Sequence, residues 1–173
     1  MRLRPLSPAD LGDIQELIQD PDTLRFTRIP EPPGEDFAQD WIARYQQARE
    51  TGTKEAFAIT DEDGAFLGLA LAPSIDAEAA EAELGYMVAA HARGRGVASE
   101  ALALLTRWAF EERGVLRASL VIDVDNPASK RVAERAGYSF EGVMRSTYLK
   151  QGRRSDTELW SRLPGDPPVT TAR

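Results

Sequence analysis

Four stretches of the chain carry apolar residues three and four positions apart, a spacing that places them on one face of a helix. Each stretch begins beside a residue suited to cap a helix start. The predicted helices span residues 7–20, 36–51, 96–113 and 126–137. Pro127 follows Asn126 and suits the first helical position of the last helix. Gly114 is well placed to end the helix before it.

Short apolar or alternating runs between these helices predict β-strands. The predicted strands span residues 2–6, 55–60, 65–72, 79–88, 116–124, 138–143 and 157–163. The segment Asp61-Glu62-Asp63-Gly64 is typical of a hairpin turn, and a turn at Gly152 is expected to join the last two strands. The order β, α, α, β, β, β, α, β, α, β, β predicts a mixed α/β fold with helices on both faces of one sheet.

Two segments do not fit this pattern. Residues 20–36 contain four prolines and many charges, so we expect a long irregular loop, which is uncommon in a compact domain unless it is functional or disordered. Three apolar residues of this loop either line a pocket or anchor it on the core: Leu24, Phe26 and Ile29. Residues 164–173 have three prolines and little apolar content, so a disordered tail is expected after a single domain at residues 1–163.

The charge of the chain narrows its partners. It has 28 acidic and 21 basic residues and a net charge of -7. Because phosphate binding needs a basic face, this balance argues against nucleic acid as the main partner. The acidity either steers a cationic substrate, such as an amine, or only maintains solubility.

Missing residue types exclude further chemistry. The chain has no cysteine and a single histidine, His91, so disulfides, thiolate catalysis and the usual multi-histidine metal clusters are excluded, and no metal is expected. No apolar run approaches the ~20 residues of a membrane helix, and the N-terminus lacks the apolar region of a secretory signal. We therefore expect a cytoplasmic protein that does not bind membranes.

The stretch from residue 83 to residue 108 reads as a strand, a short turn and a helix. The turn carries Arg93, Gly94, Arg95 and Gly96. Free N–H groups at a helix start form an anion site with the helix dipole, and glycines allow the backbone to approach the anion closely. The arginines either match phosphate oxygens or are solvated surface charges. This turn is predicted to hold a pyrophosphate.

In this context the pattern Arg93-x-x-Gly96-x-Ala98 resembles the acyl-CoA-binding motif of the GNAT superfamily of N-acetyltransferases. The order of elements agrees with that superfamily from Leu3 to Leu163. The resemblance implies a mixed, mostly antiparallel central sheet of about six to seven strands with helices on both faces.

Four segments also look like the Rim-type protein N-terminal acetyltransferases, a branch whose related folds acetylate antibiotics and other small amines. They are Glu83-Leu84-Gly85-Tyr86; Arg93 to Ala101; Asn126-x-x-Ser129 leading to Ala136-Gly137-Tyr138-x-x-Glu141-Gly142; and Asp156-x-x-x-Trp160-Ser161-x-x-Pro164.

The resemblance implies acetyl-CoA as cosubstrate. Strands 84–88 and 120–124 are expected to diverge, so that backbone groups of the first strand pair with the pantetheine arm. An N–H at Met87 or Val88 is expected to hold the oxyanion. The residues predicted to bind acetyl-CoA are Met87, Val88, Ala89, Arg93, Gly94, Arg95, Gly96, Val97, Ala98, Ser99, Asn126 and Ser129.

Glu83 is the candidate catalytic base, with a structural or surface carboxylate as the alternative. Tyr86 has the opposite strand parity and should face the other side of the sheet, which makes it a weaker candidate. Many GNAT members carry a tyrosine acid where this chain has Val132. Ser129 either hydrogen-bonds the sulfur of CoA, as a second catalytic residue, or completes the cap of its own helix. The remaining candidates are Tyr138, Tyr148 and His91.

Three functions remain open. The first is acetylation of a protein or peptide N-terminal α-amine, and the second is acetylation of a small amine such as an aminoglycoside, a polyamine or an amino-acid analogue. The third is a non-catalytic acyl-CoA-binding module. Residues 20–36 are expected to shape the acceptor cleft, and the final strands offer a surface for a homodimer. Five carboxylates of that loop are expected to attract a cation: Asp20, Asp22, Glu31, Glu35 and Asp36.

Overall fold

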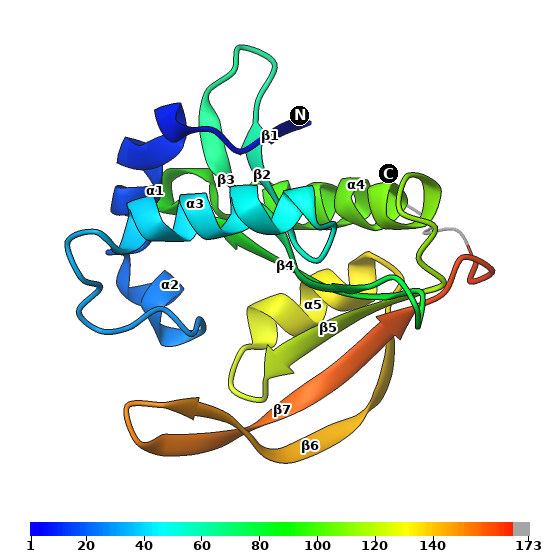
Figure 1. Ribbon diagram of the computed structural model, residues 1–173. Coiled ribbons are helices and arrows are strands. Elements are labelled where there is room, and N and C mark those ends of the chain that lie inside the picture. Colours follow the sequence, from blue (N-terminus) through cyan, green and yellow to red (C-terminus); the bar gives the residue numbers. More distant parts are fainter. Residues whose placement is uncertain (168–173) are drawn as a thin grey trace.

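The computed structural model describes residues 1–167 and contains one sheet of seven strands in the order β1-β2-β3-β4-β5-β7-β6 (Figure 1). The strands are β1 (Arg2–Pro5), β2 (Glu55–Thr60), β3 (Phe66–Asp76), β4 (Glu81–Val88), β5 (Arg117–Asp123), β6 (Ser139–Lys150) and β7 (Arg153–Arg162). The helices are α1 (Leu11–Leu17), α2 (Pro21–Arg25), α3 (Phe37–Glu50), α4 (Val97–Glu111) and α5 (Pro127–Arg135), with 3-10 turns η1 (Pro8–Asp10) and η2 (Ala90–Ala92). Most of the predicted tail, residues 168–173, lies outside the described residues.

All neighbouring strands are antiparallel except β4 and β5, which run parallel. Their pairing covers Glu81–Glu83 against Arg117–Ser119 and then stops. Beyond this point the two strands diverge, as Figure 1 shows. The mostly antiparallel mixed sheet and the predicted divergence of these strands are both confirmed.

Each face of the sheet has its own apolar core. Successive residues of a strand face opposite sides, so Phe57 and Ile59 belong to one cluster and Ala56 and Ala58 to the other. Helices α4 and α5 cover the first face, and α1 and α3 cover the second. The structure thus places helices on both sides of β4, the strand expected to carry the site.

The prediction of an irregular loop at residues 20–36 was wrong in part, because α2 lies inside it. The Asp20 side chain accepts a hydrogen bond from the Thr23 N–H at 2.8 Å, and Pro21 occupies the first helical position. The same arrangement starts α5, where Asn126 Oδ1 accepts from the Ser129 N–H at 3.0 Å. The Asp-Pro pair was therefore the sequence signal for α2.

The hairpin of β6 and β7 is longer than predicted. β6 continues to Lys150 because a bulge between Met144 and Tyr148 re-aligns it with β7. Ser146 adopts a φ of 57° in this bulge, and its N–H donates to Asp156 at 2.8 Å. Polar residues at the bulge interrupt the apolar pattern of the sequence. For this reason the sequence-based prediction missed the second half of β6.

β6 is also an outer strand of the sheet, and three of its apolar side chains are exposed: Phe140, Val143 and Leu149. Pairing of subunits through these last strands stays a prediction.

Gly68 allows β3 to approach β4 where the predicted site lies. Its φ is +150°, and a Cβ at this position would lie 2.1 Å from the Met87 carbonyl oxygen. Gly68 pairs with Val88, so any side chain here would displace the end of β4.

We predict that Gly68→Ala lowers the free energy of unfolding by about 2 kcal/mol or more, because the methyl group meets backbone atoms that cannot move aside. Urea denaturation measures this loss. Gly85→Ala is the matched control, because Gly85 lies on β4 and no atom would lie within 4 Å of its added Cβ. The control should change stability by less than about 1 kcal/mol; equal losses for both variants would contradict the close approach at Gly68.

Candidate active site

The turn before α4 presents a row of free backbone donors. Gly94 and Gly96 have φ values of 72° and 80°, and apart from the adjoining residues no atom of residues 1–167 lies within 4 Å of a Cβ built on either glycine. Among residues 1–167, no group accepts a hydrogen bond from the N–H groups of residues 94–99. An open, positively polarised helix start of this kind suits a phosphate group. The geometry fits the predicted pyrophosphate site, whose ligand contacts stay a prediction.

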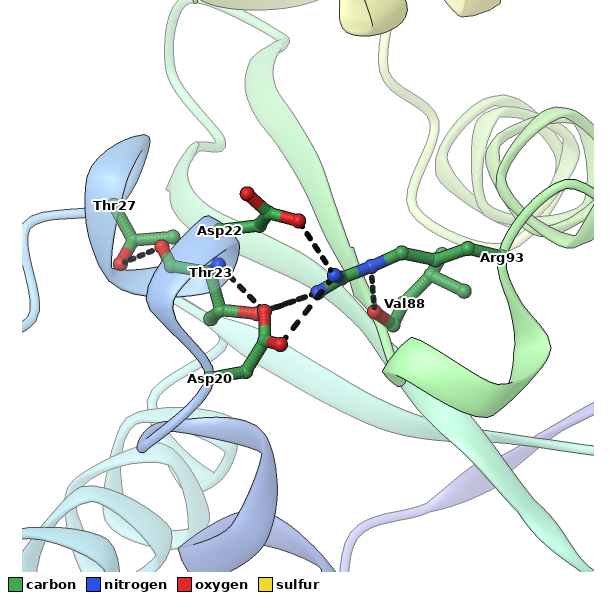
Figure 2. Close-up of polar contacts among 6 residues, drawn as sticks. All are labelled: Asp20, Asp22, Thr23, Thr27, Val88 and Arg93. Carbon is green, nitrogen blue, oxygen red and sulfur yellow. Dashed lines mark hydrogen bonds and ion pairs between the residues drawn. The ribbon is translucent and has the colours of Figure 1, made fainter.

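Arg93 differs from expectation. Its N–H donates to the Ala90 carbonyl at 3.3 Å, so the row of free donors starts one residue later. Its guanidinium points to α2, as Figure 2 shows, where it pairs with Asp20 and with Asp22 at 3.0 Å. Its Nε donates to the Val88 carbonyl at 3.1 Å. Arg93 therefore joins the turn, the end of β4 and α2.

Arg95 is the arginine of the turn that remains available to a phosphate. Its side chain is exposed and has no hydrogen-bond or ion-pair partner within the described part of the chain. Sequence reasoning treated Arg93 and Arg95 alike, because the acidic partners of Arg93 lie more than 70 residues away in the chain.

Only some backbone groups at the end of β4 are available to bind an acyl carrier. Ala89 uses both of its groups internally, since its N–H donates to Leu67 O at 2.9 Å and its carbonyl accepts from the Ala92 N–H at 2.9 Å. Backbone groups of successive residues point to opposite edges of a strand. Those of Val88 therefore point away from β3 into the gap, while those of Met87 point toward β3. Of the two predicted oxyanion donors, the geometry favours Val88.

Tyr86 and Ser129 meet at the gap between β4 and α5. The Tyr86 hydroxyl lies 2.9 Å from Ser129 Oγ. Burial raises the pKa of Tyr86 to about 12, although the bond to Ser129 partly opposes this. The Ser129 N–H completes the helix cap on Asn126 while its hydroxyl faces β4, so both roles considered for this serine are geometrically compatible.

Glu83 and Tyr86 lie on opposite faces of the sheet, as their parity predicts. Tyr86 packs against the core of α4 and α5. Glu83 lies near Tyr45 of α3: burial first, and then the charge of Glu83, raise the pKa of Tyr45 to about 12. The Glu83 carboxylate is half-buried and has no hydrogen-bond or ion-pair partner among residues 1–167, a state suited to a base. That role stays a prediction.

The structure also places the other residues that were considered for acid or base catalysis. Val132 packs against the core, so no hydroxyl occupies its place. Tyr138 is buried and its hydroxyl lies 2.7 Å from Thr106 Oγ1, inside the core. His91 is exposed, with Nε2 3.1 Å from the Phe66 carbonyl oxygen.

Residues 20–36 pack against the β6–β7 hairpin. The Lys150 ammonium bonds the Leu24 carbonyl and pairs with Glu31. The Arg28 guanidinium lies 5.7 Å from the ring centre of Tyr148. The Tyr148 hydroxyl is buried without a hydrogen-bond partner in the described residues, and burial raises its pKa. These contacts hold residues 20–36 against the β6–β7 hairpin.

A shallow pocket of about 580 Å³ lies between α2 and this hairpin. It is lined by Pro21, Leu24, Arg25, Glu31, Lys150, Gln151 and Arg153. Three of these residues are basic, and the one acidic residue is paired with Lys150. Three of the five carboxylates expected to attract a cation are thus already paired: Asp20, Asp22 and Glu31.

The described residues contain neither a metal-binding cluster nor a membrane-spanning helix. Within residues 1–167, no cluster of three or more His, Cys, Asp or Glu side chains could hold a metal ion. In the same part of the chain, no helix combines the length and the apolar character needed to cross a membrane.

The link between Arg93 and Asp20 generates a prediction about stability and pH. The hydrogen bond from Arg93 lowers the pKa of Asp20 below its usual value. Asp20→Asn removes the charge but keeps a good helix cap, so it should cost about 1 kcal/mol at neutral pH. Because the folded-state pKa is lowered, the cost should be complete above the unfolded pKa of about 3.9 and vanish as the pH falls through the folded-state pKa.

Urea denaturation of both proteins at neutral pH and at progressively lower pH measures this difference. Asp22→Asn is the matched control, because Asp22 contacts the same arginine but its side chain is 75% exposed, against 19% for Asp20. The control should have a smaller effect. A cost for Asp20→Asn that persists in acid would contradict the ion pair.

Comparison with known proteins agrees with this geometry. Residues 1–139 match the family described as the acetyltransferase (GNAT) domain. The chain is 31% identical over 142 residues to the putative ribosomal N-acetyltransferase YdaF of Bacillus subtilis, and the match covers 82% of this chain and 70% of that protein.

Two solved structures share the fold. A RimL ribosomal L7/L12 α-N-protein acetyltransferase in complex with coenzyme A has a TM-score of 0.85 at 19% identity, covering 93% of this chain and 92% of that one. The spermidine N-acetyltransferase of Vibrio cholerae, in complex with CoA and spermine, has a TM-score of 0.83 at 22% identity, covering 94% of each chain. The family match and the relative from Bacillus subtilis show that the chain belongs to the GNAT family of acetyltransferases.

Proposed function

We propose that this acetyltransferase acetylates the N-terminal α-amine of a protein or peptide, with acetyl-CoA as the acyl donor. The choice of acceptor rests on one observation. Acidic side chains of residues 20–36, which are proposed to shape the acceptor cleft, are paired with basic side chains. Asp20 and Asp22 are paired with Arg93, and Glu31 is paired with Lys150. A polyamine needs several free carboxylates, whereas a peptide brings a single terminal amine and a backbone. The name of the Bacillus subtilis relative agrees with a protein acceptor.

The chain offers a complementary surface for each part of the acyl donor. The N–H groups of residues 94–99 and the Arg95 side chain are proposed to bind the pyrophosphate, and Asn126 starts the helix beside the reacting end. The free edge of β4 is proposed to hold the pantetheine arm. Bound here, acetyl-CoA supplies an activated acetyl thioester. The Val88 N–H, which points into the gap, is proposed to stabilise the oxyanion.

The acceptor requires little activation. An α-amine has a pKa of about 7.7–8, so an appreciable fraction is neutral near pH 7. Glu83 is proposed to accept the proton, directly or through water, because its half-buried carboxylate has no competing partner within the described residues. Its position on the face of α3 requires the amine to approach from that side.

Acetylation of a polyamine is the alternative, favoured by the structural similarity to spermidine N-acetyltransferase. Glu35 and Asp36 are exposed and have no side-chain partner in residues 1–167, so they are the carboxylates on which this alternative depends.

A panel of acceptors separates the two proposals. Purified protein and acetyl-CoA are incubated with peptides that begin with Ser, Ala or Thr, with the same peptides blocked at the N-terminus, and with spermidine and an aminoglycoside. Release of CoA measures turnover. We expect kcat/KM for a free N-terminus to exceed that for spermidine by at least about tenfold, and the blocked peptides to be inert. Faster turnover of spermidine, or of the blocked peptides through an internal lysine, would overturn the proposed acceptor.

A second prediction tests the phosphate site alone. Gly96→Glu should raise the Kd for acetyl-CoA at least tenfold, about 1.4 kcal/mol, because it places a carboxylate beside the pyrophosphate. Calorimetry measures this Kd. Gly114→Glu is the control, because Gly114 also has a left-handed φ, of 66°, and open surroundings but follows the other end of α4. A similar Kd for Gly96→Glu and wild type would refute the phosphate assignment.

A further inference from the structure

One contact spans the gap between β4 and α5. Tyr86 and Ser129 are 43 residues apart in the chain, yet their side-chain oxygens lie 2.9 Å apart. Because Tyr86 comes from β4 and Ser129 from the first turn of α5, the bond joins two elements that flank the proposed site of acetyl transfer. The Tyr86 ring packs against the core of α4 and α5, while its hydroxyl group reaches beyond this core to Ser129.

We propose that Tyr86 is a positioning residue, which donates its hydrogen bond to Ser129 and so aims the serine hydroxyl at the sulfur of acetyl-CoA. This inference rests on the proposed function, because it assumes that acetyl transfer takes place in this gap.

Either hydroxyl group can donate in this pair, and the proposal assigns the donor role to Tyr86. A serine hydroxyl has one proton and two lone pairs. Burial raises the pKa of Tyr86 to about 12, so its phenol stays protonated near neutral pH and is available as a donor. When Tyr86 donates to Ser129 Oγ, the serine proton remains free for another acceptor. The Ser129 N–H is already bonded to Asn126, which holds the serine backbone in place.

The residue at position 132 shows why a correctly placed serine hydroxyl would be useful in this chain. The sequence resemblance places a tyrosine acid there in many GNAT members, but Val132 packs against the core and has no proton to give. The hydroxyl of Ser129, three residues earlier on α5, is the nearest substitute on the same helix. Tyr86 then supplies from β4 the fixed geometry that a short serine side chain cannot supply alone.

Acetyl transfer in this arrangement requires no proton from Tyr86. The amine nitrogen forms a bond to the carbonyl carbon, the carbon–sulfur bond breaks, and sulfur departs with the electron pair as a thiolate. Ser129 donates a hydrogen bond to that thiolate, and the proton of the attacking amine passes to Glu83 or to solvent. Because the thiol pKa is about 8.5, a hydrogen bond is sufficient stabilisation near neutral pH.

The test is a double-mutant cycle with Tyr86→Phe and Ser129→Ala, assayed with the best acceptor of the panel. Tyr86→Phe keeps the ring and removes the hydroxyl, so we expect kcat to fall about fivefold or more while KM for acetyl-CoA changes less than about twofold. Once Ser129 is Ala, the second substitution should lower kcat by less than about twofold further. Independent, multiplicative losses would overturn the proposal, as would an effect on KM alone.

Tyr138→Phe is the matched control. Tyr138 is also buried, has a pKa of about 12 because of burial, and has its hydroxyl 2.7 Å from that of Thr106, but it lies in the core. Its loss should leave kcat within about twofold of wild type. An equal loss of kcat in Tyr138→Phe would show that any buried tyrosine hydroxyl has this effect, which would also overturn the proposal.

A binding measurement needs no acceptor and therefore separates this inference from the proposed function. The ratio of Kd for desulfo-CoA to Kd for CoA reports contacts with sulfur, and near pH 9 most of the free thiol is thiolate. We expect Tyr86→Phe and Ser129→Ala each to lower this ratio about fivefold, and Tyr138→Phe to leave it unchanged. An unchanged ratio in Tyr86→Phe would overturn the inference even if the acceptor assignment holds.

Discussion

Within residues 1–167, no strand pairs with the edge of β4 that faces β5 between Leu84 and Val88, and the rest of the described structure maintains this gap. Pairing with β5 ends at Glu83 and Ser119. The other edge of β5 is paired with β7 along Ala118–Asp123, and this pairing holds β5 in its course away from β4. Unpaired backbone groups in a protein interior are costly, so an edge kept open must be satisfied by water or by a ligand. The pantetheine arm, which has two amides, is proposed to pair with these groups in place of a strand.

The ends of this gap are fixed by different interactions. At one end Arg93 donates to the Val88 carbonyl and pairs with the carboxylate of Asp20, so it connects the end of β4, the turn before α4 and α2 (Figure 2). Nearer the reacting group, Tyr86 reaches Ser129 of α5. Arg93 therefore links α2 directly to the turn that is proposed to bind the phosphates.

The same ion pairs change how the net charge is interpreted. The net charge of -7 left two interpretations open, steering of a cationic substrate or solubility alone, and five carboxylates of residues 20–36 were expected to attract a cation. The described structure instead places basic side chains around the pocket between α2 and the β6–β7 hairpin and pairs Glu31 with Lys150. Local pairing, which depends on tertiary contacts, therefore decides the charge around this pocket more than composition does.

Local signals predicted most of the fold. Cap residues and apolar spacing identified four helices within a few residues, and strand parity separated Glu83 from Tyr86. The prediction failed where residues distant in sequence decide the outcome. No local pattern shows that Arg93 pairs with Asp20, or that a bulge at Ser146 extends β6.

The Tyr86 hydroxyl is a similar case. Parity indicated that it faces away from Glu83, but its contact with Ser129 depends on how α5 packs beside β4. The α2 helix is different, because the Asp20–Pro21 pair was a readable start signal that the neighbouring prolines obscured.

We propose that the free edge of β4 and the start of α4 together bind acetyl-CoA. Amide hydrogen exchange with and without acetyl-CoA tests this proposal most directly, because backbone N–H groups are the proposed ligands. The account predicts that exchange slows at least about tenfold at Val88 and at residues 94–99, with little change at β1 and β2. Acetyl-CoA binding that leaves these amides unprotected would contradict the account.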